Sequence, residues 1–183
     1  LDSIQGLADK IVVVDSFSTD KTKSICEKYS VKFIEHKFTG HIEQKNFAIK
    51  QATHDHILSL DADESLSDSL LVQLEIVKRS LDHDGYYFNR LTYYVDKPIF
   101  HCDWYPDKKL RLFKKNRATW TVNNPHDIIK INESSKTSYI KGDLLHFSYD
   151  SISDHIRQTN KFTTIAAKSA YQRGKRSSMF KIT

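Results

Sequence analysis

The acidic segment Asp61-Ala62-Asp63-Glu64 is the part of this 183-residue sequence best suited to chemistry. It follows the apolar residues 56–60, which are typical of a buried strand. Carboxylates at such a strand end need a partner for their charge, and a divalent cation is the natural one. Oxygen ligands with open positions favour Mg²⁺ or Mn²⁺, which in turn bind phosphate oxygens. The spacing therefore predicts a metal site at Asp61 and Asp63; the alternative is a surface turn that caps a helix from Asp68.

A second carboxylate, Asp15, follows the β-branched run at residues 11–14. The Ser, Thr and Asp side chains of residues 16–20 favour a turn and the start of a helix. Open α/β sheets bind ligands at the carboxyl ends of their strands, so Asp15 and Asp61 are expected at one ligand crevice. The alternative for Asp15 is a carboxylate that serves only the strand-end turn.

Sequence patterns typical of strands and of helices alternate through the first half of the chain. The elements that they predict would position these carboxylates. The pattern predicts strands at residues 11–14, 31–34 and 56–60, and helices at residues 22–28, 43–52 and 68–81. Such alternation with short links predicts a parallel, doubly wound α/β sheet flanked by helices.

The second half, after Gly85, has a different pattern, in which short β-rich segments follow one another. Short β-rich segments at residues 86–88, 91–95, 110–113, 128–131 and 144–147 predict mixed or antiparallel strands that extend the sheet. Residues 151–173 predict a long closing helix. Its expected buried side consists of Ile152, His155, Ile156, Phe162, Ile165, Ala166 and Ala170. We expect one domain over residues 1–183, with a ligand-binding half at 1–84 and a second half at 85–183.

Composition excludes several classes of protein. Aromatic residues make up 11% of the chain, which argues against disorder. No apolar run approaches the roughly 18 residues of a membrane span. Cys26 and Cys102 are too few for a disulfide framework and indicate a reducing, cytoplasmic compartment. The formal net charge of +5 suits an anionic partner.

The motifs, taken in order, resemble those of family 2 glycosyltransferases, which have the GT-A fold. The matching segments are Val12-Val13-Val14-Asp15-Ser16-Phe17-Ser18-Thr19-Asp20, Gln44-Lys45-Asn46 and Leu60-Asp61-Ala62-Asp63-Glu64. Downstream segments at residues 104–107, 110–113, 125–127 and 144–149 resemble a bacterial branch that includes lipopolysaccharide core transferases. Such enzymes usually begin with one further strand, so the first strand of the family fold is expected to be missing here. Because the sequence begins at Leu1 rather than Met, we expect a fragment.

The resemblance implies inverting transfer of a sugar from a nucleotide-diphosphate sugar, expected to be a UDP-sugar, with Mn²⁺ or Mg²⁺ as cofactor. Asp63 is then the metal ligand, with His146 as a further metal or phosphate contact. Asp61 is expected to contact the ribose or the metal, and Asp15 the nucleoside. Lys45 is expected to face the base or the phosphates. A solvated helix lysine and a structural strand histidine are the alternatives for Lys45 and His146.

The resemblance also implies an acceptor side. Asp127 is expected to be the general base, at a position that is often Glu in this branch; a plain loop carboxylate is the alternative. His126 is expected to orient that carboxylate or to touch the diphosphate or the acceptor. Trp104 and Tyr105 are expected to stack on an acceptor sugar, which is a carbohydrate or a lipid-linked saccharide; core packing is their alternative. Arg111 is expected to extend from the sheet towards solvent; contact with phosphate is the alternative.

Two other functions fit parts of the sequence. Residues 61–65 after an apolar strand also resemble the nucleophile motif of haloacid dehalogenase-type phosphatases, with Asp61 attacking phosphorus. A non-catalytic domain that binds sugar nucleotides is the third candidate. The basic tail at residues 173–176 and 179–181 can hold the protein to anionic lipid at the inner face of the cytoplasmic membrane. No nucleic-acid-binding module accompanies this charge.

Overall fold

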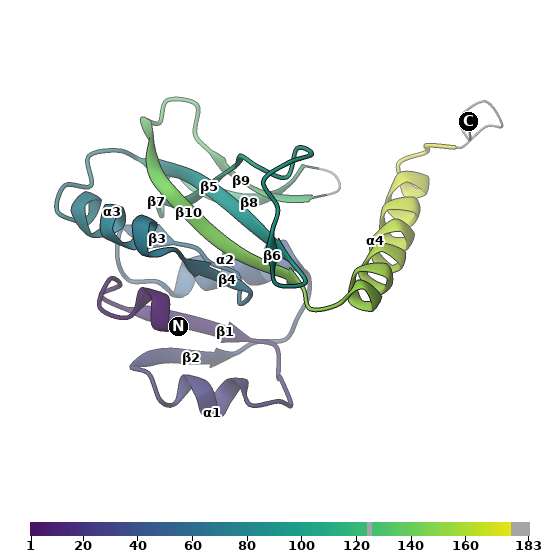
Figure 1. Ribbon diagram of the computed structural model, residues 1–183, viewed down its shortest axis with the longest axis horizontal. Coiled ribbons are helices and arrows are strands. Elements are labelled where there is room, and N and C mark those ends of the chain that lie inside the picture. The colour runs from purple at the N-terminus through teal and green to yellow at the C-terminus, as the bar shows by residue number, and fades with distance from the viewer. Residues whose placement is uncertain (124–125, 177–183) are drawn as a thin grey trace.

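The computed structural model describes residues 1–123 and 126–176, which form a mixed α/β architecture (Figure 1). The first half holds η1 (Asp2–Ile4), β1 (Ile11–Asp15), α1 (Thr22–Cys26), β2 (Val31–Glu35), α2 (His41–Gln51), β3 (His56–Leu58), β4 (Glu64–Leu66) and α3 (Asp68–Lys78). The second half holds β5 (Gly85–Tyr94), β6 (Lys97–Pro98), β7 (Asp107–Lys114), β8 (Ala118–Asn123), β9 (His126–Ile131), β10 (Thr137–Tyr149) and α4 (Ile152–Gln172).

The strands form three groups. β1 and β2 pair in parallel, with Ile11 opposite Val31. The largest sheet has the order β3-β7-β5-β10-β4, with β6 paired to β5. Within it β5 and β10 are parallel, whereas β3 pairs antiparallel with β7 from the second half. β8 and β9 form a separate antiparallel hairpin. The two segments expected at residues 86–88 and 91–95 are one continuous strand, β5.

A cavity of about 820 Å³ separates β1 from β3. Residues 11–14 line one side and residues 56–60 the other, and the cavity extends to Lys45 and Asp61. Among the described residues β1 pairs only with β2, and β3 only with β7. The two strand edges at this cavity are therefore unpaired within the described residues.

The main core lies between α3 and the large sheet. Leu70 and Leu74 of α3 pack with Phe88 of β5 and Leu144 of β10. The side chain of Ser67 accepts a hydrogen bond from the Leu70 backbone N–H and thereby caps the first turn of α3. These contacts hold the acidic segment, which directly precedes β4 and α3, against the sheet.

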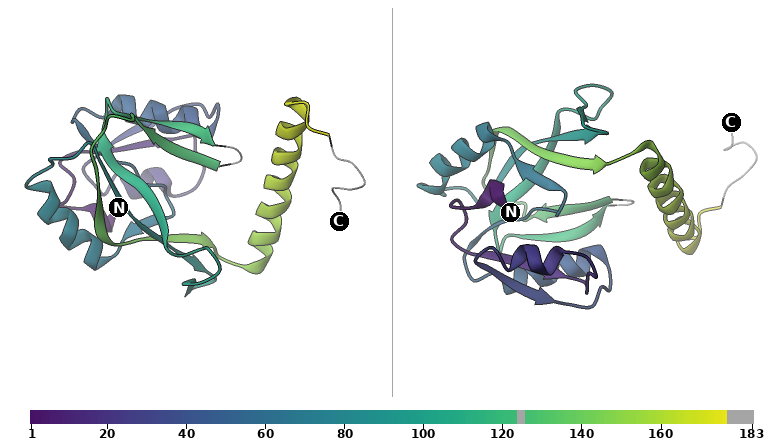
Figure 2. Two further views of the ribbon diagram at one scale, coloured as in Figure 1. Left: turned by 90° about the horizontal axis from the view of Figure 1, so that it is seen from above. Right: turned by 60° about the horizontal axis from the view of Figure 1, so that its bottom comes forward.

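Helix α4 forms where it was expected, but the prediction of a buried apolar side is wrong. Ile152, Ile156, Phe162 and Ile165 are 63%, 58%, 55% and 52% exposed. The helix stands away from the body of the molecule in every view, so little protein lies beside it to cover these side chains (Figures 1 and 2). Among the described residues its first turn is the anchored part, where His155 Nδ1 lies 3.1 Å from the hydroxyl of Tyr94. Among the described residues, no helix combines the length and apolar composition that a membrane span needs.

Candidate active site

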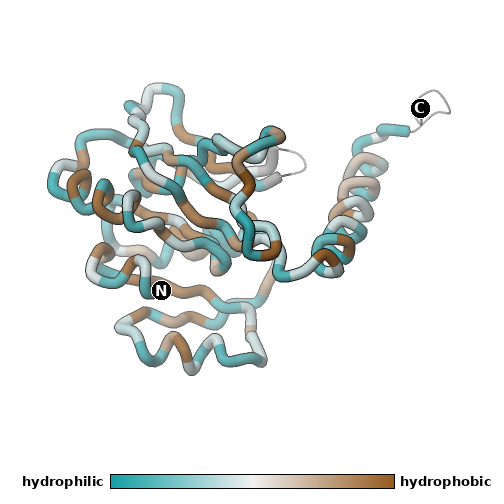
Figure 3. The backbone as a smooth tube through the Cα atoms, in the orientation of Figure 1, coloured by the Kyte–Doolittle hydropathy of each residue, from teal (hydrophilic) through white to brown (hydrophobic). Residues whose placement is uncertain are grey.

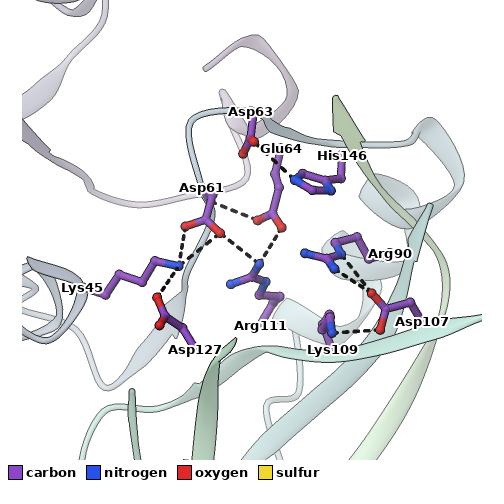
Figure 4. Close-up of polar contacts among 10 residues, drawn as sticks. All are labelled: Lys45, Asp61, Asp63, Glu64, Arg90, Asp107, Lys109, Arg111, Asp127 and His146. Carbon is purple, nitrogen blue, oxygen red and sulfur yellow. Dashed lines mark hydrogen bonds and ion pairs between the residues drawn. The ribbon is translucent and has the colours of Figure 1, made fainter. Parts of the chain in front are cut away.

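Asp61 lies between two cations that come from different elements (Figure 4). Lys45 of α2 places Nζ 2.9 Å from Asp61 Oδ1. Arg111 of β7 places Nη2 3.2 Å from Asp61 Oδ2. Burial alone would raise the pKa of Asp61, but the charges of Arg111 and Lys45 outweigh burial and hold that pKa below its usual value of 3.8. Asp61 is therefore an ionised carboxylate at neutral pH.

Arg111 and Glu64 lie buried beneath this site; the sequence analysis gave Glu64 no role of its own and expected Arg111 to point towards solvent. The expectation that Arg111 extends to solvent is wrong, because only 3% of the residue is exposed. Its Nη2 donates to Glu64 Oε1 at 2.5 Å, and Glu64 Oε2 accepts from the Asp61 backbone N–H at 3.0 Å. A charged side chain in the interior needs such a partner. Arg111 Nε and Nη1 are buried and have no hydrogen-bond partner within residues 1–123 and 126–176.

Trp120 of β8 forms an aromatic floor under both cations. Lys45 Nζ lies 4.0 Å from the centre of the Trp120 ring, and the Arg111 guanidinium carbon lies 5.1 Å from it. Asn46 of α2 holds this tryptophan by its backbone: Asn46 Nδ2 donates to the Trp120 carbonyl, and the Trp120 N–H donates to Asn46 Oδ1, both at 3.0 Å. The Gln44-Lys45-Asn46 motif therefore contributes a second functional side chain, Asn46, to which the sequence analysis gave no role.

The candidate base Asp127 lies on the same side of the cluster. Its Oδ2 is 3.9 Å from Lys45 Nζ, and its side chain is 28% exposed, so solvent or a substrate can reach it. The structure thus brings Lys45, Asp61 and Asp127 together as a chain of alternating charges (Figure 4). The side chain of His126 lies outside the described residues.

Asp61 and Asp63 face different partners, although they are two residues apart. Asp63 Oδ2 lies 3.2 Å from His146 Nε2, and the Phe147 N–H donates to the Asp63 carbonyl. β4 pairs with β10, with Glu64 opposite His146, and this register brings Asp63 next to the histidine. The expected metal ligands Asp63 and His146 are therefore neighbours, while Asp61 is engaged by cations.

Asp63 and His146 fit a divalent cation as a partial set of ligands. Across the described parts of the chain, no three His, Cys, Asp or Glu side chains are placed to hold a metal together. Mg²⁺ and Mn²⁺ sites commonly use one or two protein ligands and take the remainder from substrate phosphates and water. His146 Nδ1 is buried without a hydrogen-bond partner in the described residues, so its other nitrogen, Nε2, is the one that faces the carboxylate. The carboxylate oxygen of Asp63 is a donor that Mg²⁺ and Mn²⁺ favour, whereas the imidazole nitrogen of His146 is a donor more typical of later transition metals.

Asp15 ends β1 and is 8% exposed. Its Oδ2 accepts from the Ser18 N–H at 2.8 Å and its Oδ1 from the Ser18 hydroxyl at 2.5 Å. The hydrogen bond from the Ser18 side chain lowers the pKa of Asp15, and the backbone bond from Ser18 adds to this against the opposing effect of burial. Asp15 thus stabilises the turn after β1, and the neighbouring Ser16 lines the cavity between β1 and β3.

The expected acceptor-stacking residues lie elsewhere. Trp104 packs edge-on against Tyr94, with ring centres 6.5 Å apart. The hydroxyl of Tyr105 donates to Asp143 Oδ1 and accepts from Asn89 Nδ2. Within the described residues neither aromatic ring contacts the Asp61 cluster.

A second charged group extends the site along β7. Arg90 Nη2 and Lys109 Nζ each lie 2.8 Å from the carboxylate of Asp107. Asp107 and Lys109 share one face of β7 because side chains alternate along a strand, and the strand pairing is irregular between Leu110 and Leu112, where Arg111 lies. Figure 4 shows this group beside Arg111. The sequence analysis did not identify this group, because Arg90 is 17 residues from Asp107 in the sequence and lies on a different strand.

Comparison with known proteins identifies the family of this chain. A family model described as glycosyl transferase family 2 matches residues 1–142. An uncharacterized glycosyltransferase from Rickettsia felis is 32% identical over 197 residues, which covers 100% of this chain and 68% of the relative. A lipopolysaccharide core biosynthesis glycosyltransferase, LpsC, from Rhizobium meliloti is 27% identical, over 100% of this chain and 69% of the relative.

Solved structures give a weaker similarity. The Staphylococcus aureus TarS fragment 1–349 superposes with a TM-score of 0.43 and 22% identity, over 58% of this chain and 37% of TarS. The fold assignment therefore depends on the family match and on the mixed α/β architecture itself. On these grounds the predicted GT-A-like fold is confirmed.

Proposed function

The chain belongs to glycosyl transferase family 2, and from this premise we propose that it is an inverting transferase. It moves a sugar from a nucleotide-diphosphate sugar, expected to be a UDP-sugar, to a hydroxyl of a carbohydrate or lipid-linked saccharide. The name of the Rhizobium relative supports a role in lipopolysaccharide or surface-polysaccharide assembly. The observation that carries the proposal is the cluster of Lys45, Asp61, Arg111 and Asp127, with Asp63 and His146 beside it.

The donor nucleotide is proposed to bind between β1 and the acidic segment. The cavity there is lined by Ser16, Gln44, Lys45 and Asp61, which offer donors and acceptors for ribose and base. Asp61 is ionised, so it can accept hydrogen bonds from ribose hydroxyls. Asp15 would contribute mainly by shaping the turn that carries Ser16.

The diphosphate is proposed to lie over the cationic side of the cluster. Lys45 Nζ can donate to its oxygens, and the buried Arg111 guanidinium adds fixed positive charge beneath Asp61; charge that is already in place stabilises the negative charge that develops on a leaving group. Family 2 enzymes often use a divalent metal. Mn²⁺ or Mg²⁺, held by Asp63 and His146, would supply further positive charge for the diphosphate.

Asp127 is proposed to act as general base. As the acceptor oxygen attacks the anomeric carbon, its proton passes to the Asp127 carboxylate. The bond from that carbon to the diphosphate oxygen breaks, and the diphosphate departs with the electron pair. Attack from the side opposite the leaving group inverts the anomeric configuration. Lys45 lies between Asp127 and Asp61, so it links the base to the donor side of the site.

The phosphatase alternative is set aside. The family is one of glycosyltransferases, and both oxygens of Asp61 face cations rather than an open approach for phosphorus. We propose that the reaction takes place in the cytoplasm at the inner face of the membrane.

Nucleotide release tests the proposal directly. Full-length protein is incubated with Mn²⁺, each of a panel of nucleotide-diphosphate sugars, and saccharide acceptors extracted from the source bacterium. We expect one donor to give acceptor-dependent release. Asp127→Asn should lower turnover by about 10² or more while donor affinity stays the same, because only proton transfer is lost. Glu75→Ala, an exposed acid on α3, is the matched control. Unchanged turnover in Asp127→Asn would show that another group is the base.

A further inference from the structure

Helix α4 presents an apolar surface that the described residues leave uncovered. Five large apolar side chains on this single helix are more than half exposed. They are Ile152, Ile156, Phe162, Ile165 and Tyr171. Figure 3 shows apolar residues recurring along the whole helix, which leaves the body of the molecule at Tyr149. Helices with this pattern normally bury their apolar side against something.

The charge of the protein is concentrated on the same element. Residues 152–176 contain six of the 28 Lys and Arg residues but one of the 23 Asp and Glu residues. The rest of the chain therefore has 22 of each sign, so the whole net charge of +5 belongs to α4 and the residues that directly follow it. Arg157, Lys161 and Lys168 recur at i, i+4 and i+11, which places them in one stripe along the helix. Arg173, Lys175 and Arg176 follow at its end, and all six are exposed.

We propose that α4 and residues 173–176 form a docking surface for an anionic lipid bilayer. An apolar stripe buried at the boundary of headgroups and acyl chains, together with cations near anionic headgroups, is how interfacial helices bind. Charge complementarity favours this occupant over a second copy of the chain, because two such helices would bring like charges together. The inference specifies the surface for the proposed membrane location and depends on that location, but not on the proposed chemistry.

The root of α4 fits this placement. Trp104 and Tyr94 pack edge-on, and Tyr94 and Tyr149 both contact the ring of His155 in the first turn of the helix. Tyrosine and tryptophan are favoured at membrane interfaces because one end of each ring system is apolar and the other is polar. The anchored end of α4 is therefore aromatic and its far end is cationic.

Vesicle co-sedimentation tests the inference. The protein is mixed with vesicles of phosphatidylcholine alone or with 30% phosphatidylglycerol, a composition set at roughly the anionic content that attracts basic segments, at low and high salt. We expect binding to the anionic vesicles only, weakened by salt. Lys161→Glu/Lys168→Glu should reduce the partition coefficient by about tenfold or more, and Ile156→Glu/Ile165→Glu should reduce it similarly.

Matched controls separate this surface from general effects. Lys28→Glu/Lys141→Glu changes exposed charges elsewhere, and Val72→Glu/Ile76→Glu changes exposed apolar residues of α3; both should bind vesicles better than the α4 variant of the same kind. Equal binding to neutral vesicles, equal binding by the α4 variants, or a dimer that the α4 variants dissociate would each overturn the inference. Nucleotide release with a water-soluble acceptor should be unchanged in the α4 variants. If the α4 variants lose vesicle binding but keep nucleotide release, α4 acts in membrane docking and not in the transfer reaction. If the native protein binds vesicles but releases no nucleotide, only the proposed transfer is contradicted.

Discussion

Within the part of the chain that the structure describes, Arg111 is the side chain that compensates the charge of Glu64. The Glu64 side chain is fully buried, and Arg111 Nη2 is the cation that contacts it. Arg111→Met would keep the length of the side chain and remove the charge, leaving a carboxylate in the interior without a counter-ion. Breaking a buried pair in this way typically costs about 3–5 kcal/mol. We therefore expect a loss of this size in the free energy of unfolding, measured by urea denaturation.

Two variants serve as controls for this prediction. Arg157→Met removes an arginine whose side chain is 77% exposed, and it should change the free energy of unfolding by no more than about 1 kcal/mol. Arg111→Met/Glu64→Leu removes both buried charges and should recover part of the lost stability. If Arg111→Met alone were as stable as the native protein, the proposed dependence of Glu64 on Arg111 would be wrong.

The pKa of Asp61 leads to a prediction about acid stability. Burial raises this pKa, but Arg111 and Lys45 lower it further than burial raises it, so the folded value lies below 3.8. The folded state therefore binds the proton less readily than the unfolded chain. The resulting stability is present above about pH 4 and is lost as the pH falls through the folded pKa.

Asp61→Asn should therefore lose less stability than the native protein between about pH 5 and pH 3. Chemical denaturation at a series of pH values measures the two slopes. Asp20→Asn provides a comparison, because the hydrogen bond from the Thr22 side chain lowers its pKa in a fully exposed turn. Parallel slopes for Asp61→Asn and the native protein would show that the two cations do not favour the ionised form.

At the scale of elements, Asn46 fastens α2 to the β8–β9 hairpin. It makes two hydrogen bonds with the backbone of Trp120, whose ring lies under Lys45. Asn46→Ala would leave a buried N–H and carbonyl without these partners, at a cost of about 2 kcal/mol. We expect this loss in urea denaturation, and we also expect a lower turnover because Lys45 loses its support.

Asn46→Asp provides a sharper comparison, since it keeps the acceptor for the Trp120 N–H and removes the donor. Its free energy of unfolding should lie between that of the native protein and that of Asn46→Ala. Asn132→Ala, an exposed position just after β9, should change stability by no more than about 0.5 kcal/mol. An effect of Asn46→Ala as small as that of Asn132→Ala would contradict the role of this link.

The elements of the first half could be predicted because local pattern determines them. The run at residues 11–14 is short and β-branched, the run at residues 31–34 is short with β-branched residues at both ends, and both are strands. Pairing between distant segments could not be predicted in this way. Arg111 is 50 residues from Asp61, and nothing local indicates that β3 pairs with β7 and brings the two together. For this reason the motif acids were identified, while their buried partner was expected in solvent.

At the scale of the whole molecule, α4 shows what periodicity leaves open. A period of 3.6 residues identifies an apolar side, but it does not specify what covers that side. We expected this side to be buried in the protein, whereas the helix stands away from the body of the molecule (Figure 1). The sequence analysis placed the cationic surface in a tail at residues 173–176 and 179–181, of which residues 179–181 lie outside the described residues. The structure adds the three basic residues of α4 itself.

The position of Asp63 and His146 beside the Asp61 cluster predicts that metal and nucleotide bind together. Within the described residues the metal alone finds only two protein ligands, Asp63 and His146. The diphosphate alone finds the charge of Lys45 but lacks the positive charge of the metal. Ligand at about 100 times its dissociation constant stabilises the folded state by about 2.7 kcal/mol. For a chain of this size that corresponds to a rise in Tm of roughly 5–10 °C. UDP with Mn²⁺ should give this rise, and either one alone should give clearly less.

Asp63→Ala should lose the extra rise, while Asp127→Asn and Glu75→Ala should keep it. If Asp63→Ala responded to the mixture as the native protein does, the metal would have to be held elsewhere.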